Sequence, residues 1–116
     1  NLKLIVKIIH KEIRKKFQLF LNKNKNKKII IMDIPLLLEN KINKKTDILI
    51  FVDSKKSDIL KRLKKRINFN KKLFNEFKKI QLKVGYKKSK SNFIIKNDFT
   101  KNKIKISIKK ILKKIL

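Results

Sequence analysis

The sequence predicts an α/β protein in which helices flank a parallel sheet. Two short runs, Ile29–Met32 and Ile48–Val52, are apolar and rich in β-branched residues, and an aspartate directly follows each of them. Neither run alternates between apolar and polar residues. Strands with both faces covered have this pattern, as in the parallel sheets of α/β proteins. Amphipathic stretches separate and follow the runs, which is the order expected for crossover connections between parallel strands.

A helix is predicted first, from apolar residues that recur at spacings of three and four. They are Leu2, Ile5, Ile9, Ile13, Phe17 and Phe20. The polar run 22–28 has no apolar residue to anchor it and is expected to be a loop. The strand Ile29–Met32 follows, and Pro35 makes its continuation within a central ladder unfavourable. We therefore expect 28–39 to be a buried strand that runs into a turn.

Two amphipathic helices are predicted after the strand Ile48–Val52, with Ser54 and Asn70 as their caps. Their apolar faces consist of Ile59, Leu60, Leu63 and Ile67 in the first helix and Leu73, Phe74, Phe77 and Ile80 in the second. A short third strand is predicted at Phe93–Ile95, and a terminal helix follows. The stripe of that helix is formed by Ile104, Ile108, Ile111, Leu112 and Ile115. With no internal repeat or Gly/Pro-rich linker, one domain is expected.

Composition excludes several classes of site. The chain has 116 residues and no Cys, which removes disulfides, thiolate nucleophiles and Cys-based zinc sites. His10 is the only histidine, so a His-rich metal cluster is excluded too, and we assign no metal ligand. The apolar runs are too short to cross a bilayer, and no signal peptide opens the chain. We expect a cytoplasmic protein with no membrane partner. Asn1 in place of Met hints at a longer reading frame or a processed chain.

The formal net charge of +28 raises the alternative of a basic nucleic-acid-binding protein. Two observations favour a solvated lysine surface instead. Only Arg14, Arg62 and Arg66 are arginines, whereas base-reading and bidentate phosphate sites favour arginine. The lysines are also spread along the whole chain beside many Ile and Asn, as AT-rich codon usage would produce. The terminal helix, with its apolar stripe among lysines, fits an anionic membrane surface as well, but packing on the sheet explains that stripe more simply.

Candidate site residues lie where the predicted strands end, because ligands of open α/β sheets bind beyond the carboxyl ends of the strands. The segment 33–39, Asp-Ile-Pro-Leu-Leu-Leu-Glu, is either a site loop or an ordinary strand–turn–helix junction. Arg62 and Arg66, one helical turn apart, either clamp a phosphoryl group or are two more solvated cations. Their rarity in a lysine-rich chain favours the clamp. His10 is either a base or ligand contact or a structural residue. Gly85 is the only glycine, so a Gly-rich phosphate loop cannot lie in this chain.

Taken in order, these segments resemble dephospho-CoA kinase over essentially the whole chain. The residues that carry the resemblance are Leu4, His10, Ile29–Glu39 with its Asp-x-Pro-Leu-Leu-x-Glu run, Ile50–Asp53, Leu60–Arg66, Gln81, Lys87 and Asn92–Asn97. The resemblance implies a P-loop kinase of the adenylate-kinase type, which uses ATP and Mg²⁺ to phosphorylate the ribose 3′-hydroxyl of dephospho-CoA, the last step of coenzyme A synthesis. Residues 1–116 would be the C-terminal part of one such domain, with a substrate-side helix, a Pro-Leu-Leu loop, a lid-like segment 62–82 and the terminal helix.

The resemblance also implies roles for particular residues. The dephospho-CoA side would comprise His10, Asp33, Pro35, Leu36, Leu37 and Glu39. The ATP side would comprise Arg62, Arg66 and Asn97, with Asn97 near the adenine.

The chain departs from the family pattern in several places. The family's phosphate loop and its acidic base precede the region present here, so no catalytic residue is assigned and residues 1–116 are expected to be inactive alone. Lys11 replaces the usual Pro, Asn92 replaces the usual acid, and the Gly after the last Asn is missing. The family's first strand, which lies between those expected at 29–32 and 48–52, would also be missing. Without its hydrogen bonds we expect a marginally stable or aggregation-prone chain.

Overall fold

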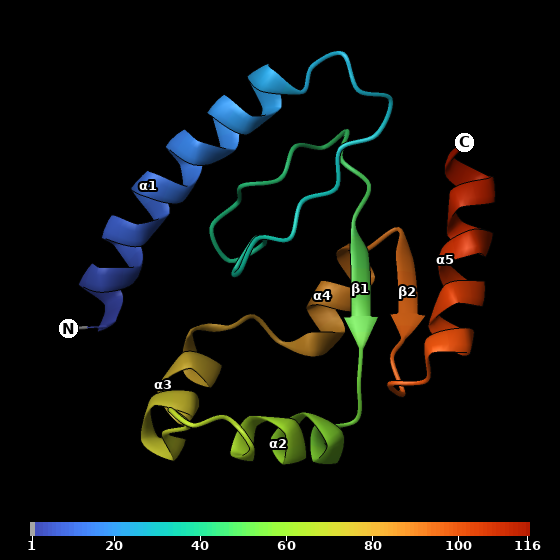
Figure 1. Ribbon diagram of the computed structural model, residues 1–116. Helices are drawn as coiled ribbons and strands as arrows, with labels where there is room; N and C mark the ends of the chain where they lie inside the picture. The colour runs from blue at the N-terminus through green and yellow to red at the C-terminus, as the bar shows by residue number, and fades with distance from the viewer. Residues whose placement is uncertain (1) are drawn as a thin grey trace. The chain divides into compact units, whose positions relative to one another are not determined.

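The computed structural model describes residues 2–116 and divides into two compact units, Asn1–Lys44 and Lys45–Leu116. Figure 1 shows the elements of both units, which are described separately below. The α/β class and the parallel strand pairing predicted from the sequence are confirmed. No helix in the described part of the chain is both long and apolar enough to cross a membrane.

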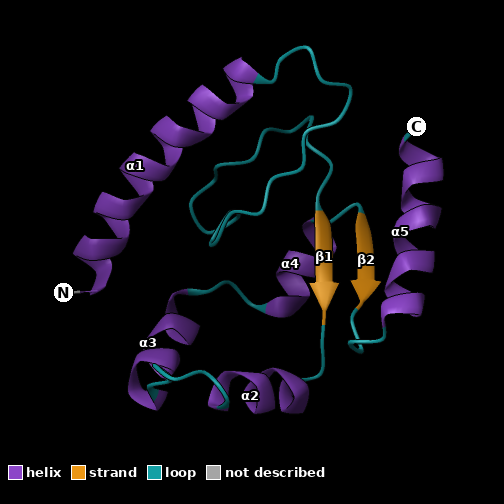
Figure 2. Cartoon of the chain, viewed as in Figure 1, coloured by secondary structure: helices purple, strands orange, loops and turns teal. Residues whose placement is uncertain are grey.

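The first unit consists of helix α1, Leu2–Lys23, followed by a long irregular segment, drawn in teal in Figure 2. The predicted helix is confirmed. It ends at a polar turn, in which both the backbone N–H and the side-chain amide of Asn24 donate to the Phe20 carbonyl, at 3.1 and 2.9 Å. Asparagine favours such local side-chain bonds over continuation of a helix. The predicted loop therefore begins within two residues of its expected start.

The predicted strand at Ile29–Met32 is wrong, because 29–34 has no strand hydrogen bonding. Ile31 exposes 82% of its surface, so the segment is not buried as a whole either. The physical reason is the absence of a neighbour: both strands of the described chain lie in the other unit and pair with each other. A β-prone sequence becomes a strand only when another strand satisfies its N–H and C=O groups.

The second unit contains the sheet, formed by β1 (Ile50–Asp53) and β2 (Phe93–Lys96) in parallel. Ile50 pairs with Phe93 and Asp53 with Lys96. The strand expected at Ile48–Val52 is thus shifted, but Leu49 still takes part, since its carbonyl accepts the N–H groups of Asn92 and Phe93 at 2.8 and 3.1 Å. The third predicted strand is confirmed. Parallel strands need a long crossover connection, and the one between β1 and β2 holds three helices.

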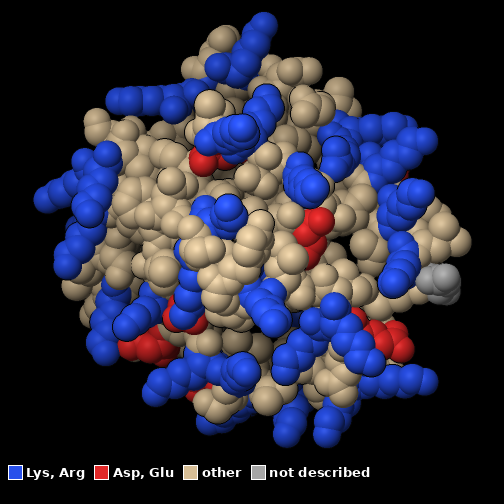
Figure 3. Space-filling view, turned by 180° about the vertical axis from the view of Figure 1, so that it is seen from behind, with Lys and Arg blue, Asp and Glu red and all other residues tan. Residues whose placement is uncertain are grey.

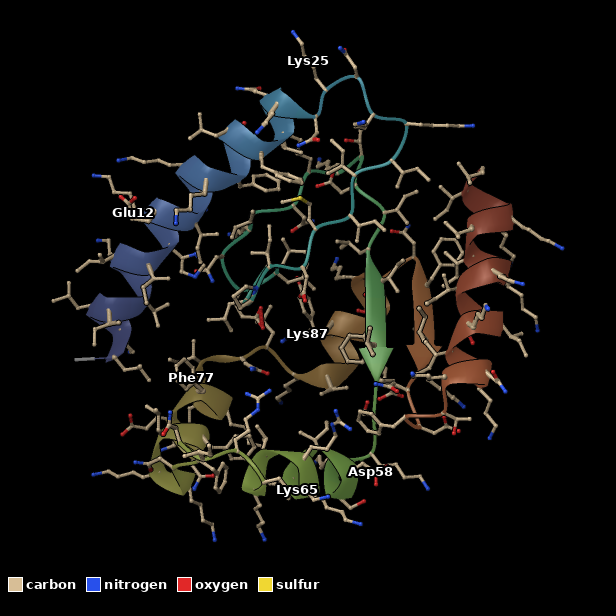
Figure 4. All side chains as sticks on the ribbon, in the orientation of Figure 1. Glu12, Lys25, Asp58, Lys65, Phe77 and Lys87 are labelled. Atoms are coloured by element: carbon tan, nitrogen blue, oxygen red, sulfur yellow. The ribbon has the colours of Figure 1, made fainter. Side chains whose placement is uncertain are left out.

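Helix α2, Lys56–Lys64, corrects two predictions. Its N-cap is Lys55, which makes no side-chain cap bond, and not Ser54. Ile67 lies beyond the helix and is fully exposed, because the chain tightens after Lys64 with the Arg66 N–H donating to the Leu63 carbonyl at 3.0 Å. Asp58 in the first turn (Figure 4) and basic residues in the last still match the helix dipole.

Helices α3 (Lys71–Ile80) and α4 (Val84–Lys90) complete the crossover. The predicted cap of α3 is confirmed, since the Asn70 side chain accepts the Leu73 N–H at 3.2 Å. Helix α4 was not predicted. Its seven residues, VGYKKSK, include a glycine and only two large apolar side chains, too few to establish a helical period.

The core of the second unit lies between β2 and the terminal helix α5, Lys101–Ile115, which is confirmed. Ile95 and Ile111 are buried there. Ile50 and Val52 lie on the same face as Ile95 but remain 44% and 56% exposed, because α5 packs on β2. The expectation that both faces of the strands are covered is therefore not met within residues 2–116.

Candidate functional site

The segment after Pro35 in the first unit forms a compact hydrogen-bonded turn. The N–H groups of Asn40 and Ile42 donate to the carbonyls of Leu36 and Leu37, both at 3.1 Å. The Asn40 side-chain amide donates to the Leu36 carbonyl as well, at 2.8 Å. Leu36 and Lys41 take left-handed backbone conformations, with φ of 54° and 50°. Such angles are uncommon outside glycine and persist when surrounding bonds enforce them, so this loop has a defined shape.

Arg14 ties this turn to helix α1. Its guanidinium Nη2 donates to the Asn40 backbone carbonyl at 2.7 Å, across 26 residues of sequence. A charged donor makes this bond stronger than one between neutral groups. The helix and the turn are thereby joined at Asn40, the residue whose side chain and backbone N–H also hydrogen-bond within the turn.

His10 lies one helical turn before Arg14 and therefore on the same face of α1. Its side chain is buried, and its Nδ1 has no hydrogen-bond partner among the described residues. Buried polar atoms in folded proteins are nearly always hydrogen-bonded. An unpartnered, buried ring nitrogen therefore has capacity for a bond to a bound molecule.

The other predicted substrate-side residues lie at or just before the turn. Pro35 is exposed, while Leu36, Leu37 and Glu39 are half-buried. Asp33 precedes the turn and is exposed. The structure thus gathers Pro35 to Glu39 in one loop and leaves Asp33 on the segment that leads into it.

In the second unit, the carboxyl ends of β1 and β2 form a polar edge. Asp53 ends β1, and its carboxylate accepts from the Lys88 ammonium at 2.8 Å in a partly buried ion pair. The Asp53 carbonyl accepts the N–H of Asn97 at 2.7 Å, so the chain leaving β2 is held beside the end of β1. Residues that follow both strands are thereby brought to one place, as expected for a parallel sheet.

Asn97 shapes the turn that follows β2. Its Oδ1 accepts the N–H of Phe99 at 2.9 Å, and the Asp98 Oδ1 accepts the N–H of Thr100 at 3.0 Å. Phe99 is held at φ 63°, in the left-handed region. Asparagine and aspartate favour turns of this kind because their side chains bond the backbone two residues on.

Phe99 lies under the guanidinium of Arg62, with the Arg62 Cζ 4.2 Å from the ring centroid. This distance is well within the range of a cation–π contact. The contact joins α2 to the turn after β2. It also places Arg62, one of the two residues predicted to bind phosphate, directly on an aromatic face.

Arg62 and Arg66 line one open pocket of ≈ 490 Å³. The other lining residues are Ile59, Leu63, Lys65 and Phe99. The two predicted arginines are therefore brought together, although Arg66 lies beyond the end of α2. Asn97 is not among the lining residues and contributes through the turn that holds Phe99. An aromatic ring beside three cations suits a planar anionic ligand.

The face shown in Figure 3 carries mixed charge. Lys and Arg side chains are scattered widely in Figure 3, with a few acids between them. Among residues 2–116, no group of three His, Cys, Asp or Glu side chains is placed to hold a metal ion. The Lys103 ammonium, with help from the Thr100 N–H, lowers the pKa of the exposed Asp98 carboxyl below its ordinary value of 3.8.

Three residues of these clusters were not identified from the sequence: Arg14, Asn40 and Phe99. Arg14 carried a signal, because the rarity of arginine that favoured Arg62 and Arg66 applies to it equally. The Asn-Asp-Phe-Thr run at 97–100 also has the composition of a turn built by side-chain bonds. Neither signal identifies the contact partner, because Asn40 is distant in sequence from Arg14, and Arg62 is distant from Phe99.

Comparison with known proteins gives a consistent answer. A family model described as dephospho-CoA kinase matches residues 1–103. A protein of Wolbachia pipientis wMel named dephospho-CoA kinase is 29% identical over 114 residues, which are 97% of this chain and 58% of that protein. One of Prochlorococcus marinus (strain NATL2A) is 32% identical over 106 residues, with coverage of 91% and 50%, and one of Bartonella quintana (strain Toulouse) is 31% identical over 97 residues, with coverage of 82% and 50%. The chain spans about half the length of these curated relatives.

Proposed function

This chain belongs to the dephospho-CoA kinase family, and we propose that its protein transfers the γ-phosphoryl group of ATP to the ribose 3′-hydroxyl of dephospho-CoA. The observation that carries the proposal is the family match over residues 1–103, because that range includes both clusters described above. We assign residues 1–116 to the C-terminal part of one kinase domain, with 62–82 as its lid-like segment. A cytoplasmic location belongs to the same proposal and rests on the family.

The turn at 35–41 and the adjoining face of α1 are the proposed dephospho-CoA side. A substrate with a hydroxyl to be phosphorylated needs a polar contact and a rigid wall. His10 provides a buried nitrogen without a partner among the described residues, and the half-buried Leu36 and Leu37 provide apolar surface. Arg14 fixes the turn to the helix through Asn40. Holding an acceptor in one geometry accelerates a transfer reaction by removing its freedom before the reaction.

The pocket lined by Arg62, Arg66 and Phe99 is the proposed ATP side. Phosphoryl transfer develops charge on the oxygens of the transferred group, and fixed cations stabilise it. Arg66 and Lys65 are exposed cations on the pocket wall, and both can reach phosphate oxygens without leaving a buried partner. Asn97 supports this side by holding the turn that carries Phe99.

Neither a metal ligand set nor a general base is assigned to this chain. Residues 2–116 gather no metal-binding group of side chains, and Asp53 and Asp98 are engaged with Lys88 and Lys103. Mg²⁺ is commonly bound through substrate phosphates with only one or two carboxylates, so we route no step through it. The single glycine also leaves no phosphate loop in the chain. We therefore expect residues 1–116 alone to show no turnover.

The test is a kinase assay on the protein encoded by the whole reading frame that contains these residues. Mass spectrometry should detect an ATP-dependent 3′-phosphorylated product. Arg66→Met should raise the KM for ATP about tenfold or more, the cost of a lost hydrogen bond to a charged group, and leave the KM for dephospho-CoA unchanged. His10→Ala should do the reverse. Lys109→Met, the same loss of charge at an exposed position of α5 outside the lid-like segment, is the matched control and should change neither.

Absence of any ATP-dependent product at saturating substrate would overturn the proposal. So would equal effects of Arg66→Met and Lys109→Met, because the role of Arg66 would then reduce to net charge. Nucleic-acid binding with sequence preference that survives physiological salt would support the alternative function that the net charge of +28 raises.

A further inference from the structure

We propose that Phe99 and Arg62 together form a selectivity element, which favours ligands that carry a planar base and a phosphate chain in one molecule. The inference rests on the proposed ATP side and deepens it. Phe99 would offer its ring to the base, while Arg62 would leave that ring for the phosphates. Without ligand the Arg62 guanidinium covers one face of the Phe99 ring.

The observed contact is closed. With 4.2 Å between the Arg62 Cζ and the Phe99 centroid, nothing fits between the guanidinium and the ring. Inserting a base would require about twice the 3.5–4.0 Å contact distance between non-bonded carbons. A base can therefore reach this face of Phe99 only after Arg62 has moved.

The two partners differ in mobility. Phe99 is held in a left-handed conformation by the bond from its N–H to Asn97, in a turn that leads directly into α5. A non-glycine residue in that region costs energy, and it persists where its neighbours enforce it. Arg62 is a long, exposed side chain on α2. The Phe99 backbone is thus fixed, whereas Arg62 has the longer side chain with more rotatable bonds, so we expect the contact to open by movement of Arg62.

The surroundings give Arg62 a second position. Lys65 and Arg66 line the same pocket, so an anion bound among these residues attracts Arg62 away from the ring. Phe99 is already 39% exposed with Arg62 in place, and departure of Arg62 would uncover a further apolar face, which favours stacking of a base on the ring. A base that binds alone displaces Arg62 from the ring and gives the guanidinium no new partner. An anion that binds alone draws Arg62 away and leaves that face of the ring exposed to water. A ligand with both groups compensates both losses.

Three probes separate the two halves of the element: adenosine, inorganic tripolyphosphate and ATP. Binding is measured by calorimetry on the full-length protein, with nuclear magnetic resonance spectra to establish that each variant is folded. Phe99→Leu should weaken adenosine about tenfold, as expected for loss of one stacking contact. It should leave tripolyphosphate unchanged or bind it about two- to fivefold more tightly, because Arg62 no longer has to leave a ring.

Arg62→Met should give the opposite pattern. Adenosine should bind about two- to fivefold more tightly because the ring is uncovered. Tripolyphosphate should bind about tenfold more weakly because a charged hydrogen-bond donor is lost. The matched control is Tyr86→Leu, which changes an exposed ring on α4, outside the pocket and outside the lid-like segment 62–82, and should alter no affinity.

The outcomes distinguish this inference from the proposed function. If ATP binds the wild-type protein but Phe99→Leu behaves as Tyr86→Leu does towards adenosine, the selectivity element is refuted and the ATP side stands. The same conclusion follows if Arg62→Met weakens adenosine and tripolyphosphate alike. If ATP itself does not bind the wild-type protein, the proposed ATP side fails, and this inference fails with it.

Discussion

Arg14→Ala should loosen the turn at 35–41 without unfolding the helix that carries it. The substitution removes the 2.7 Å bond from the guanidinium to the Asn40 carbonyl. A hydrogen bond from a charged group contributes about 1.5–3 kcal/mol, and exposure to solvent reduces that contribution. Because this bond is exposed, we expect a loss of about 1 kcal/mol in the free energy of local opening.

Native-state hydrogen exchange measures that loss directly. The N–H groups of Asn40, Lys41 and Ile42 close the turn by donating to carbonyls at 36–38, so they exchange when it opens. A loss of about 1 kcal/mol corresponds to about fivefold faster exchange, at roughly 1.4 kcal/mol per factor of ten. Amides in the middle of α1 should keep their rates, because their own bonds are untouched. Arg14→Lys should give exchange rates at 40–42 between those of the wild-type protein and Arg14→Ala, since a single ammonium can replace part of the bond.

Lys15→Ala is the control on the same helix. Lys15 pairs with Glu12 at 3.5 Å, with 64% and 60% of the two side chains exposed. Figure 4 shows Glu12 on the side of α1 away from the turn. Removing this pair should not change exchange at 40–42. The reasoning is refuted if Arg14→Ala leaves those rates unchanged, or if it accelerates exchange equally along α1, which would indicate general destabilisation.

Three further results are expected. Asn70→Ala removes the acceptor of the Leu73 N–H and should lower the free energy of unfolding by about 1 kcal/mol, measured by urea unfolding followed by circular dichroism. Asn70→Asp keeps an acceptor and should cost little. Equal costs for the two variants would contradict the role of Asn70 as the cap. Because its pKa is lowered, Asp98 stabilises the fold above pH 3.8, and that contribution is lost as pH falls through the lowered pKa. Lys103→Met should raise the carboxyl midpoint towards 3.8 in a resonance titration, and an unmoved midpoint would exclude Lys103 as its main cause. Residues 1–116 alone should unfold in urea with a slope below the usual range of about 1–3 kcal/mol/M, and a cooperative transition within that range would show that they are not marginally stable.

Much of the fold could be predicted because its signals are local. Helices α1 and α5 follow from apolar residues three and four positions apart, and the cap of α3 follows from Asn70 and the N–H three residues on. Parallel pairing of the strands also followed from their unalternating apolar sequence and the helices between them. Each of these inferences compares a residue with close neighbours, whose spacing the backbone fixes.

The prediction at Ile29–Met32 failed where the signal was not local. Its four apolar residues favour a strand as strongly as 50–53 does, yet only 50–53 has a partner in the described chain. A helix satisfies its own backbone groups, whereas a strand depends on another segment. The misplaced cap at Ser54 and the exposed Ile67 are smaller errors, which arise because helix ends depend on where the chain turns.

The sequence by itself therefore determined the α/β class, the family resemblance and the segments that carry the candidate site residues. Only the tertiary structure decided which of those residues meet. It joined Arg14 to Asn40, placed Arg62 on Phe99 and left the Nδ1 of His10 buried without a partner among the described residues. The physical reason is range: spacing along the chain fixes local geometry, but contacts between distant residues depend on how the elements pack.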